Sequence, residues 1–279
     1  MAISPVNEIL TSFQSKKLAR ILDDNTLLLQ KSLERLTSGL HIVDSGDDPS
    51  GVAQTGKLNS QIKRLDAVEA NLSNASDLVQ SQSDFLTTVS TKLSRLSALA
   101  VLSSNTSTTA DERSSYQIEF AQIQAFISDI GRRTFNNQSL FGTSYTTIID
   151  EDGAQYTLQA INYNANAAAG GINDVFFDTV SVSTTTAAAA AQATVSTAIA
   201  NLGILQTRAS STKDFIDDAN DLLVSLEENL QSTVDRIQNT NTTTETVEYN
   251  RLSLLTQTGQ TMLANYESLR LGLLDLLEI

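Results

Sequence analysis

A seven-residue apolar repeat constrains the fold of this chain more than any other feature of its sequence. From residue 58 to residue 102 an apolar side chain opens each heptad, and most heptads carry a second apolar side chain three positions later. The first positions are Leu58, Leu65, Leu72, Val79, Leu86, Leu93 and Ala100. Because the stretch contains no glycine and no proline, it predicts one helix of about 66 Å at 1.5 Å per residue, which outruns a compact globule.

A second series near the other end has the same period and a matching length. Its first positions are Val195, Leu202, Ala209, Ile216, Leu223, Leu230 and Ile237. We expect the two helices to pack on each other as an antiparallel coiled coil. The predicted core of this helical rod is Leu65, Leu72, Leu86, Leu93, Leu202, Ile216, Leu223 and Leu230. A shorter helix is predicted from about Asp111 to Arg132, with Thr109 or Asp111 as its N-cap.

The segment between the long helices has the residue types of β structure. Residues 145–149 and 155–159 flank Asp150-Glu151-Asp152-Gly153, which predicts a β-hairpin whose glycine takes a positive φ, and a third strand is expected over 175–182. Because the segment lacks a heptad, we expect it at the outer tip of the rod, where few buried contacts depend on it. Twelve glycines and two prolines are too few for an all-β fold. The expected fold is mainly α, a long antiparallel coiled-coil rod with a small β-hairpin insert.

Both terminal segments carry further amphipathic stripes. Their predicted contact positions are Leu18, Ile21, Leu29, Leu36, Leu255, Met262, Leu269 and Leu276. If residues 58–237 already close a rod, these stripes have no partner within the monomer. They are therefore expected to be buried between molecules.

The composition excludes most enzyme chemistry. The chain has no cysteine and one histidine, His41, which removes disulfides, thiolate sites and multi-histidine metal sites. We expect no catalytic, cofactor-binding or metal-binding residues. Asp150–Gly153 is interpreted as a turn and not a calcium loop, and the cluster of Asp44, Asp47 and Asp48 as loop capping and not an acid/base pair.

The charge balance and the apolar runs exclude further classes. A net charge of -14 repels nucleic acid and anionic membrane surfaces. No apolar run approaches the length of a bilayer span, so membrane insertion is not expected. The first residues lack a basic stretch followed by an apolar region, which argues against a cleaved secretory signal. A cytoplasmic protein, or one exported by a dedicated machine, fits these observations.

Several stretches resemble bacterial flagellins, the subunits of the flagellar filament. Residues 33–42 (LERLTSGLHI) and 47–53 (DDPSGVA) are similar to that family's "LERLSSGLRI…DDAAGLA" signature. Residues 134–141 (TFNNQSLF) resemble its "QFNG..L" turn, and residues 254–277 resemble its closing helix. The resemblance covers about residues 1–141 and 190–279.

The resemblance implies a secreted, non-enzymatic subunit that assembles into the bacterial flagellar filament used for motility, exported without a cleaved signal peptide. The implied organisation has inner-tube helices at 1–50 and 240–279, disordered in the monomer, rod halves at 51–144 and 190–239, and the β insert at 145–189. The implied partners are other copies of the chain, an export chaperone at the C-terminal helix, and filament cap and junction proteins.

The resemblance also implies contact with an animal innate immune receptor, at the matching positions Arg95, Leu99 and Glu119. The family pattern "RVREL" has lost its second arginine and its glutamate here, which predicts weakened binding. Two alternatives stay open. Asp-Asp-Pro at 47–49 is also seen in hook-filament junction proteins, and the apolar termini would also suit a secreted coiled-coil adhesin or effector.

Overall fold

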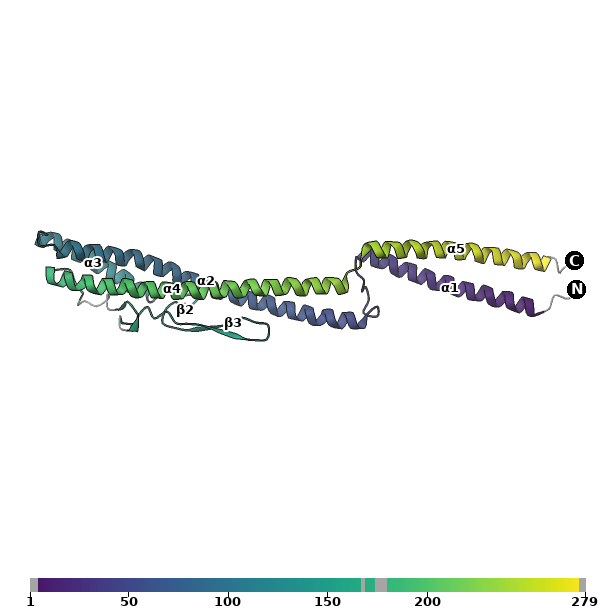
Figure 1. Ribbon diagram of the computed structural model, residues 1–279, viewed down its shortest axis with the longest axis horizontal. Coiled ribbons are helices and arrows are strands. Elements are labelled where there is room, and N and C mark those ends of the chain that lie inside the picture. Colours follow the sequence, from purple (N-terminus) through teal and green to yellow (C-terminus); the bar gives the residue numbers. More distant parts are fainter. Residues whose placement is uncertain (1–4, 167–168, 174–179, 276–279) are drawn as a thin grey trace. The chain divides into compact units, whose positions relative to one another are not determined.

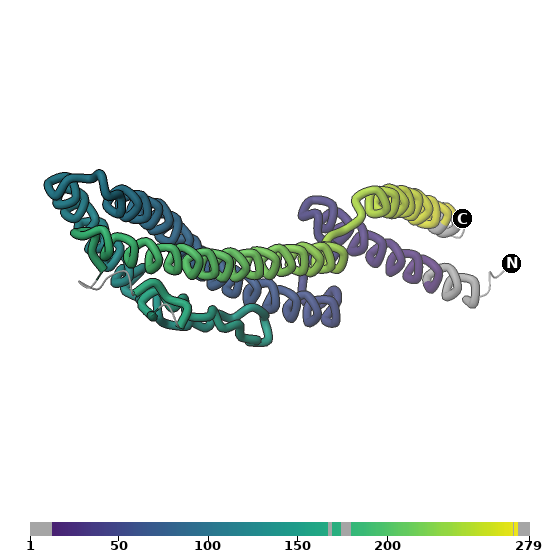
Figure 2. The backbone as a smooth tube through the Cα atoms, turned by 60° about the vertical axis from the view of Figure 1, so that its left-hand side comes forward, coloured from purple at the N-terminus to yellow at the C-terminus, as the bar shows by residue number. Residues whose placement is uncertain are grey.

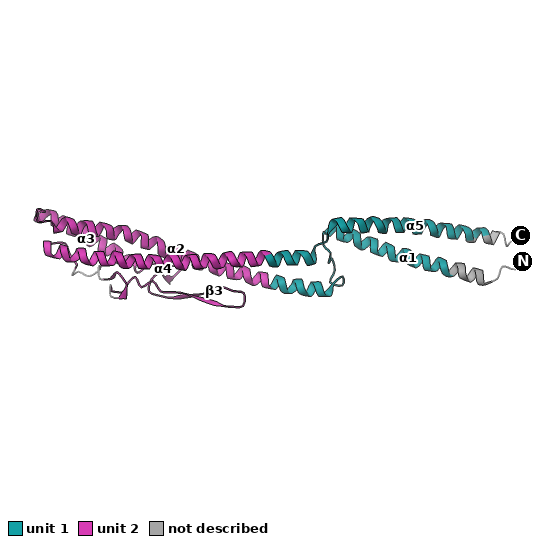
Figure 3. Cartoon of the chain, viewed as in Figure 1, with its two compact units in different colours: residues 1–60, 229–279 teal, residues 61–228 magenta. Residues whose placement is uncertain are grey.

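The computed structural model describes residues 5–166, 169–173 and 180–275, and it is dominated by helices (Figure 1). The helices are α1 (Pro5–Ser38), α2 (Pro49–Ser104), α3 (Ala110–Ile130), α4 (Thr185–Gln238) and α5 (Thr242–Asp275). Two antiparallel hairpins pair β1 (Thr134–Phe135) with β2 (Gln138–Ser139), and β3 (Tyr145–Ile148) with β4 (Gln155–Leu158). The chain divides into two compact units, residues 1–60 with 229–279 (unit 1) and residues 61–228 (unit 2) (Figure 3).

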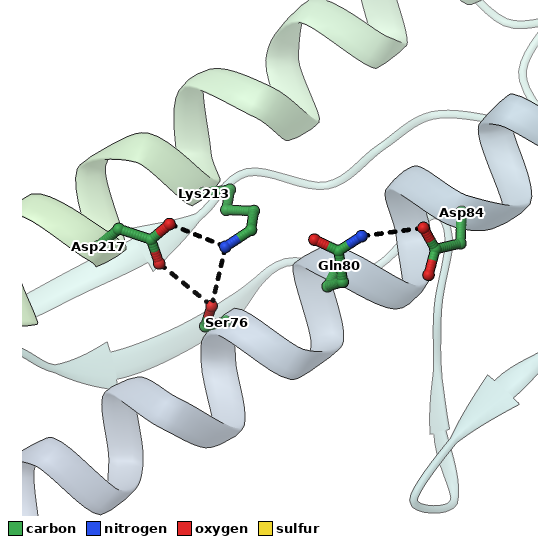
Figure 4. A network of polar contacts seen from close by, with 5 residues as sticks. All are labelled: Ser76, Gln80, Asp84, Lys213 and Asp217. Carbon is green, nitrogen blue, oxygen red and sulfur yellow. Dashed lines mark hydrogen bonds and ion pairs between the residues drawn. The ribbon is translucent and has the colours of Figure 1, made fainter.

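In unit 2, α2 and α4 run antiparallel and bury the predicted heptad positions between them. Ser76 of α2 meets Lys213 and Asp217 of α4 (Figure 4): the Lys213 ammonium lies 2.8 Å from Asp217 Oδ2, and the Ser76 hydroxyl donates to Asp217 Oδ1 at 3.3 Å. Nearer the start of α2, Asp66 and Glu69 lie close to Glu227 of α4. Partial burial is the main cause that raises the pKa of Glu227, and the negative charges of Asp66 and Glu69 raise it further. The predicted antiparallel pairing is confirmed. The buried positions in this seam include Leu65, Leu72, Leu86, Leu93, Leu202, Ile216 and Leu223.

Helix α3 turns back along α2 and adds a third helix to unit 2. Its N-cap is Thr109, as predicted, in a capping box: the Glu112 N–H donates to the Thr109 hydroxyl at 3.3 Å, and the Thr109 N–H donates to Glu112 Oε2 at 2.8 Å. The Arg113 guanidinium donates to the carbonyls of Ser103 and Thr108, which fixes the turn between the helices. The α3 residues buried against the unit are Phe120, Gln124, Ile127 and Ile130.

The β1–β2 hairpin is the turn that the family motif at 134–141 predicts. Asn136 and Asn137 have φ values of 48° and 64°, so both central residues are left-handed, as a two-residue type I′ turn requires. Asparagine tolerates this region better than most residues with a side chain. The turn directs Leu140 inward, where its carbonyl accepts a hydrogen bond of 2.5 Å from the Gln82 amide.

The β3–β4 hairpin forms where it was predicted, but it does not lie at the tip. Asp150–Gly153 is its turn, with Gly153 at φ 89° and its N–H donating to the Asp150 carbonyl at 3.1 Å. The Tyr156 ring stacks on Phe215 of α4 with centroids 4.1 Å apart, and the Gln61 amide donates to Glu151 Oε1 at 3.1 Å. The hairpin therefore lies along the flank of the helices of unit 2 (Figures 1 and 2), because its aromatic face finds a partner there.

The segment beyond this hairpin contributes to the core, which corrects the expectation that few buried contacts depend on it. Tyr163 is fully buried; its hydroxyl donates to the Ile127 carbonyl at 2.7 Å, and burial raises its pKa. Gly131 passes so close that a Cβ there would lie 2.2 Å from Asn164 Oδ1. Helix α4 starts at Thr185, inside the range assigned to the insert. Of the strand expected over 175–182, residues 175–179 lie outside the described residues and 180–182 are not a strand.

In unit 1, α1 and α5 pack antiparallel, so the expectation that the terminal stripes have no partner within the chain is wrong. The Tyr266 hydroxyl of α5 donates to Gln14 Oε1 of α1 at 2.7 Å, and a Cβ on Gly259 would lie 3.1 Å from the Leu22 side chain. The segment that follows α1 is hydrogen-bonded to the segment that precedes α5, because the Thr240 N–H donates to the Gly39 carbonyl at 2.9 Å.

The acidic loop before α2 is a capping structure, as predicted. Asp48 caps the helix by accepting from the Ser50 N–H at 3.1 Å. Asp47 accepts from Lys31 at 2.5 Å and from the Val43 N–H at 3.2 Å. The pKa of Asp47 is lowered to about 2, mainly by the hydrogen bond from Lys31. Partial burial raises this pKa, and hydrogen bonds from the backbone N–H groups of Val43 and Asp44 lower it further.

The buried seam predicts a large difference between two leucines of unit 2. Leu72 is fully buried, so Leu72→Ala should lower the free energy of unfolding by about 2–5 kcal/mol. Leu222 is 70% exposed, so Leu222→Ala should change it by less than about 0.5 kcal/mol. Urea unfolding followed by circular dichroism measures both, and equal losses would contradict this assignment of the core.

The Asp47 ion pair predicts an acid-sensitive contribution to stability. Because the folded pKa lies below the unfolded value of about 4, the contribution is complete above pH 4 and is lost as the pH falls from about 4 to about 2. The urea midpoints of wild type and Asp47→Asn should differ at neutral pH and converge over this range. Asp44→Asn alters a carboxylate of the same loop and is the control; an equal effect there would show that loop charge alone is responsible.

Candidate assembly surfaces

Helices α1 and α5 contact each other but leave most of their large apolar side chains uncovered. Among the side chains described on these helices, Leu252 is the only large apolar one that is buried. The exposed ones are Phe13, Ile21, Leu27, Leu28, Leu33, Val247, Leu254, Leu255, Met262, Tyr266, Leu269 and Leu271. Such density of exposed apolar surface on two helices marks an interaction surface.

The predicted terminal positions differ in how far their side chains are exposed. Leu18, Leu29 and Leu36 are half-buried. Ile21, Leu255, Met262 and Leu269 are exposed. Leu276 lies outside the described residues.

Other exposed leucines lie outside the predicted contact positions, although the sequence carries a signal for them. Leu27, Leu28 and Leu29 are consecutive, as are Leu254 and Leu255. Neighbouring residues on a helix are about 100° apart, so a single partner helix cannot cover all of a consecutive set. Adjacent leucines on a helix that is not buried on all sides therefore indicate that more than one face of the helix makes contacts.

The remaining rod position, Leu230, belongs to unit 1 and is half-buried. Helix α4 contains an 18-residue window with a mean hydropathy of 1.3, which a membrane-spanning helix could also have by length and composition. Its buried side chains, among them Val195, Leu202 and Ala209, pack within the helical core of unit 2. One third of the 18-residue window is buried, so core packing accounts for part of the apolar character of α4.

Several threonine hydroxyls on α4 and α5 form hydrogen bonds within their own helix. They donate to the carbonyl four residues earlier in the same helix, so their hydrogen-bonding capacity is used locally. Such bonds are made by Thr194, Thr197, Thr207, Thr212, Thr246, Thr258 and Thr261, at 2.6–3.2 Å.

The structure brings two of the three candidate receptor residues together and buries the third. The Arg95 guanidinium donates to both carboxylate oxygens of Glu119, at 2.7 and 2.9 Å, joining α2 to α3 on an exposed face. The mutual hydrogen bonds raise the pKa of Arg95 and lower that of Glu119. Leu99 has an exposed fraction of 0%, because α3 adds a second apolar seam beside the heptad. Its assignment as a contact residue is therefore wrong for the folded unit.

His41, the histidine on which any Ser/His chemistry would depend, is exposed in the loop after α1. Among the described residues, no three His, Asp or Glu side chains are grouped so as to hold a metal ion.

Family comparisons cover both helical ends of the chain. The model of the bacterial flagellin N-terminal helical region matches residues 9–146, and that of the bacterial flagellin C-terminal helical region matches residues 185–277. A flagellin of Halalkalibacterium halodurans is 31% identical over 89% of this chain and 91% of its own length. A flagellar filament 33 kDa core protein of Treponema phagedenis is 29% identical over 92% of this chain and 95% of its own length.

A solved structure, described as the crystal structure of Bacillus cereus flagellin, aligns with a TM-score of 0.48 at 20% identity over 55% of this chain and 88% of its own. The two family models together match more than half of the chain, and the relatives extend over most of it. The chain belongs to the bacterial flagellin family and is a structural subunit of the flagellar filament.

Proposed function

We propose that α1 and α5 form the surface through which copies of this chain assemble into the filament. The supporting observation is how little apolar surface these helices bury. Helices α1 and α5 have 34 residues each, and among the side chains described on the two helices together one large apolar side chain, Leu252, is buried. A pair with so little core gains little from folding alone, because ordering each residue costs about 1–2 kcal/mol of backbone entropy. Burial of the exposed leucines against neighbouring copies offsets this cost.

In this proposal residues 1–50 and 240–279 form the inner tube and are disordered in the free monomer, while the rod halves at 51–144 and 190–239 form the outer tube. A contact surface that is not self-complementary and does not close into a ring produces an open helical polymer. The assembly contacts are then Ile21, Leu255, Met262 and Leu269, with Leu18, Leu29 and Leu36 holding α1 and α5 together.

The same exposed apolar surface supports two further parts of the proposal. An export chaperone would cover α5 before assembly, and cap or junction proteins with equivalent terminal helices would bind at the filament ends. Export would proceed without a cleaved signal peptide, and the subunit would have no enzyme activity. The exposed Arg95–Glu119 pair is the remaining candidate contact for an innate immune receptor.

Assembly is expected to depend on the apolar character of Leu254, which is 66% exposed. Leu254→Asp should abolish filament formation, because burying an unpaired carboxylate between copies is strongly unfavourable. Leu254→Met keeps an apolar side chain and should still assemble. Sedimentation and electron microscopy measure both variants, with circular dichroism as the check on monomer folding. Normal filaments from Leu254→Asp would overturn the assignment of this surface.

Limited proteolysis of the free monomer should remove roughly residues 1–50 and 240–279 and leave unit 2 intact, because the terminal helices have the fewest buried contacts. Mass spectrometry identifies the fragments, and sedimentation tests whether the remaining core still assembles. Assembled filaments should resist the same treatment. Terminal helices that are as resistant in the monomer as in the filament would contradict disorder before assembly.

A further inference from the structure

A groove of about 440 Å³ opens in unit 2 between α2 and the two hairpins. Its apolar lining includes Ala75 and Leu78 of α2, with Phe135 of β1 and Leu158 of β4. All four residues of β3 line the groove, and this strand pairs with β4 on its other side. The groove therefore runs along the edge of β3 that pairs with no other strand in the described part of the chain.

The backbone of β3 presents hydrogen-bonding groups at this edge that β4 does not use. The Ile149 N–H donates to the Ala154 carbonyl at 2.9 Å, which sets the alternation of the ladder. Because hydrogen-bonded pairs alternate with non-hydrogen-bonded pairs, Thr147–Tyr156 and Tyr145–Leu158 are the bonded ones. The N–H and C=O groups of Thr146 and Ile148 point away from β4, where an added strand can pair with them. The Ile148 carbonyl also accepts a long hydrogen bond of 3.5 Å from the Thr147 hydroxyl.

The opposite side of the groove offers neutral amides. Asn71 and Asn74 lie one turn apart on α2, and Asn136 and Gln138 belong to the neighbouring hairpin. Side-chain amides both donate and accept, so they suit the backbone of an extended peptide. None of the residues that the structure describes along this groove is charged, although the chain has a net charge of -14.

We propose that this groove binds a short, uncharged, extended segment of another polypeptide as a third strand beside β3. Main-chain hydrogen bonds to Thr146 and Ile148 hold the segment, and alternate side chains contact the apolar lining, which is the general mode of β-strand addition. A second folded copy is a poorer occupant. Its own β3 would enter together with the paired β4, and a groove of about 440 Å³ is too small for two strands. A charged segment would lose hydration without gaining an ionic partner.

The test is a titration of isotope-labelled, full-length monomer with the neutral peptide acetyl-TVTVT-amide, followed by amide chemical shifts and hydrogen exchange. The Thr146 and Ile148 amides are expected to shift and to exchange more slowly in the complex. The peptide with alternate N-methylated residues should not bind, because it cannot form the ladder. Equal binding of the methylated peptide, or no binding of either, overturns the proposal.

Two matched proline variants separate the groove edge from the fold. Ile148 and Gln155 are directly opposite in a non-hydrogen-bonded pair, so proline at either position removes an N–H that faces away from the hairpin. Ile148→Pro should weaken binding by about tenfold or more, whereas Gln155→Pro alters the far edge and should leave binding unchanged. Equal effects overturn the proposal.

Two further measurements exclude other occupants. Shifts of the same amides with monomer concentration alone would indicate a second copy. Shifts produced by maltotriose without slowed exchange would indicate a carbohydrate site. Either result counts against strand addition.

Discussion

The apolar seam between α2 and α4 is the interaction on which unit 2 depends. Leucine, valine and alanine at heptad spacing are buried along both helices, and the polar contacts beside the seam, such as Lys213 with Asp217 and Ser76, are exposed. Exposed ion pairs contribute little to stability, so the apolar contacts carry most of the folding free energy of this unit. The hairpins, α3 and the segment around Tyr163 then pack onto a surface that the seam has already positioned.

The two units differ in how completely they bury their apolar side chains, and this difference is the basis of the proposed division between folding and assembly. Unit 2 combines α3, the larger parts of α2 and α4, and two hairpins around a continuous core. Helices α1 and α5 contact each other along one face, and most of their large apolar side chains on other faces are exposed. A filament subunit needs both properties, because it must have a stable body and must still expose apolar surface for contact with neighbouring copies.

Local chemistry in the sequence was sufficient to predict the helices and turns. The heptads located the antiparallel pair, Thr109 located the start of α3, and Gly153 located the hairpin turn. The position of the hairpin on the helix flank was not predictable, because it depends on Tyr156 meeting Phe215, two residues far apart in the chain. The burial of Leu99 was missed for a similar reason, since a two-helix heptad does not account for a third helix. The pairing of α1 with α5 could not be derived from either stripe alone, because an amphipathic helix does not specify its partner.

The locally satisfied threonines on α4 and α5 have a consequence for any surface that packs against these helices. A long charged side chain at these positions would keep a shell of bound water and many rotamers, both of which must be given up at a contact. A threonine whose hydroxyl is already bonded to its own helix is short, rigid and only weakly hydrated. A contact made through such threonines would therefore displace little bound water and leave no hydroxyl without a hydrogen bond.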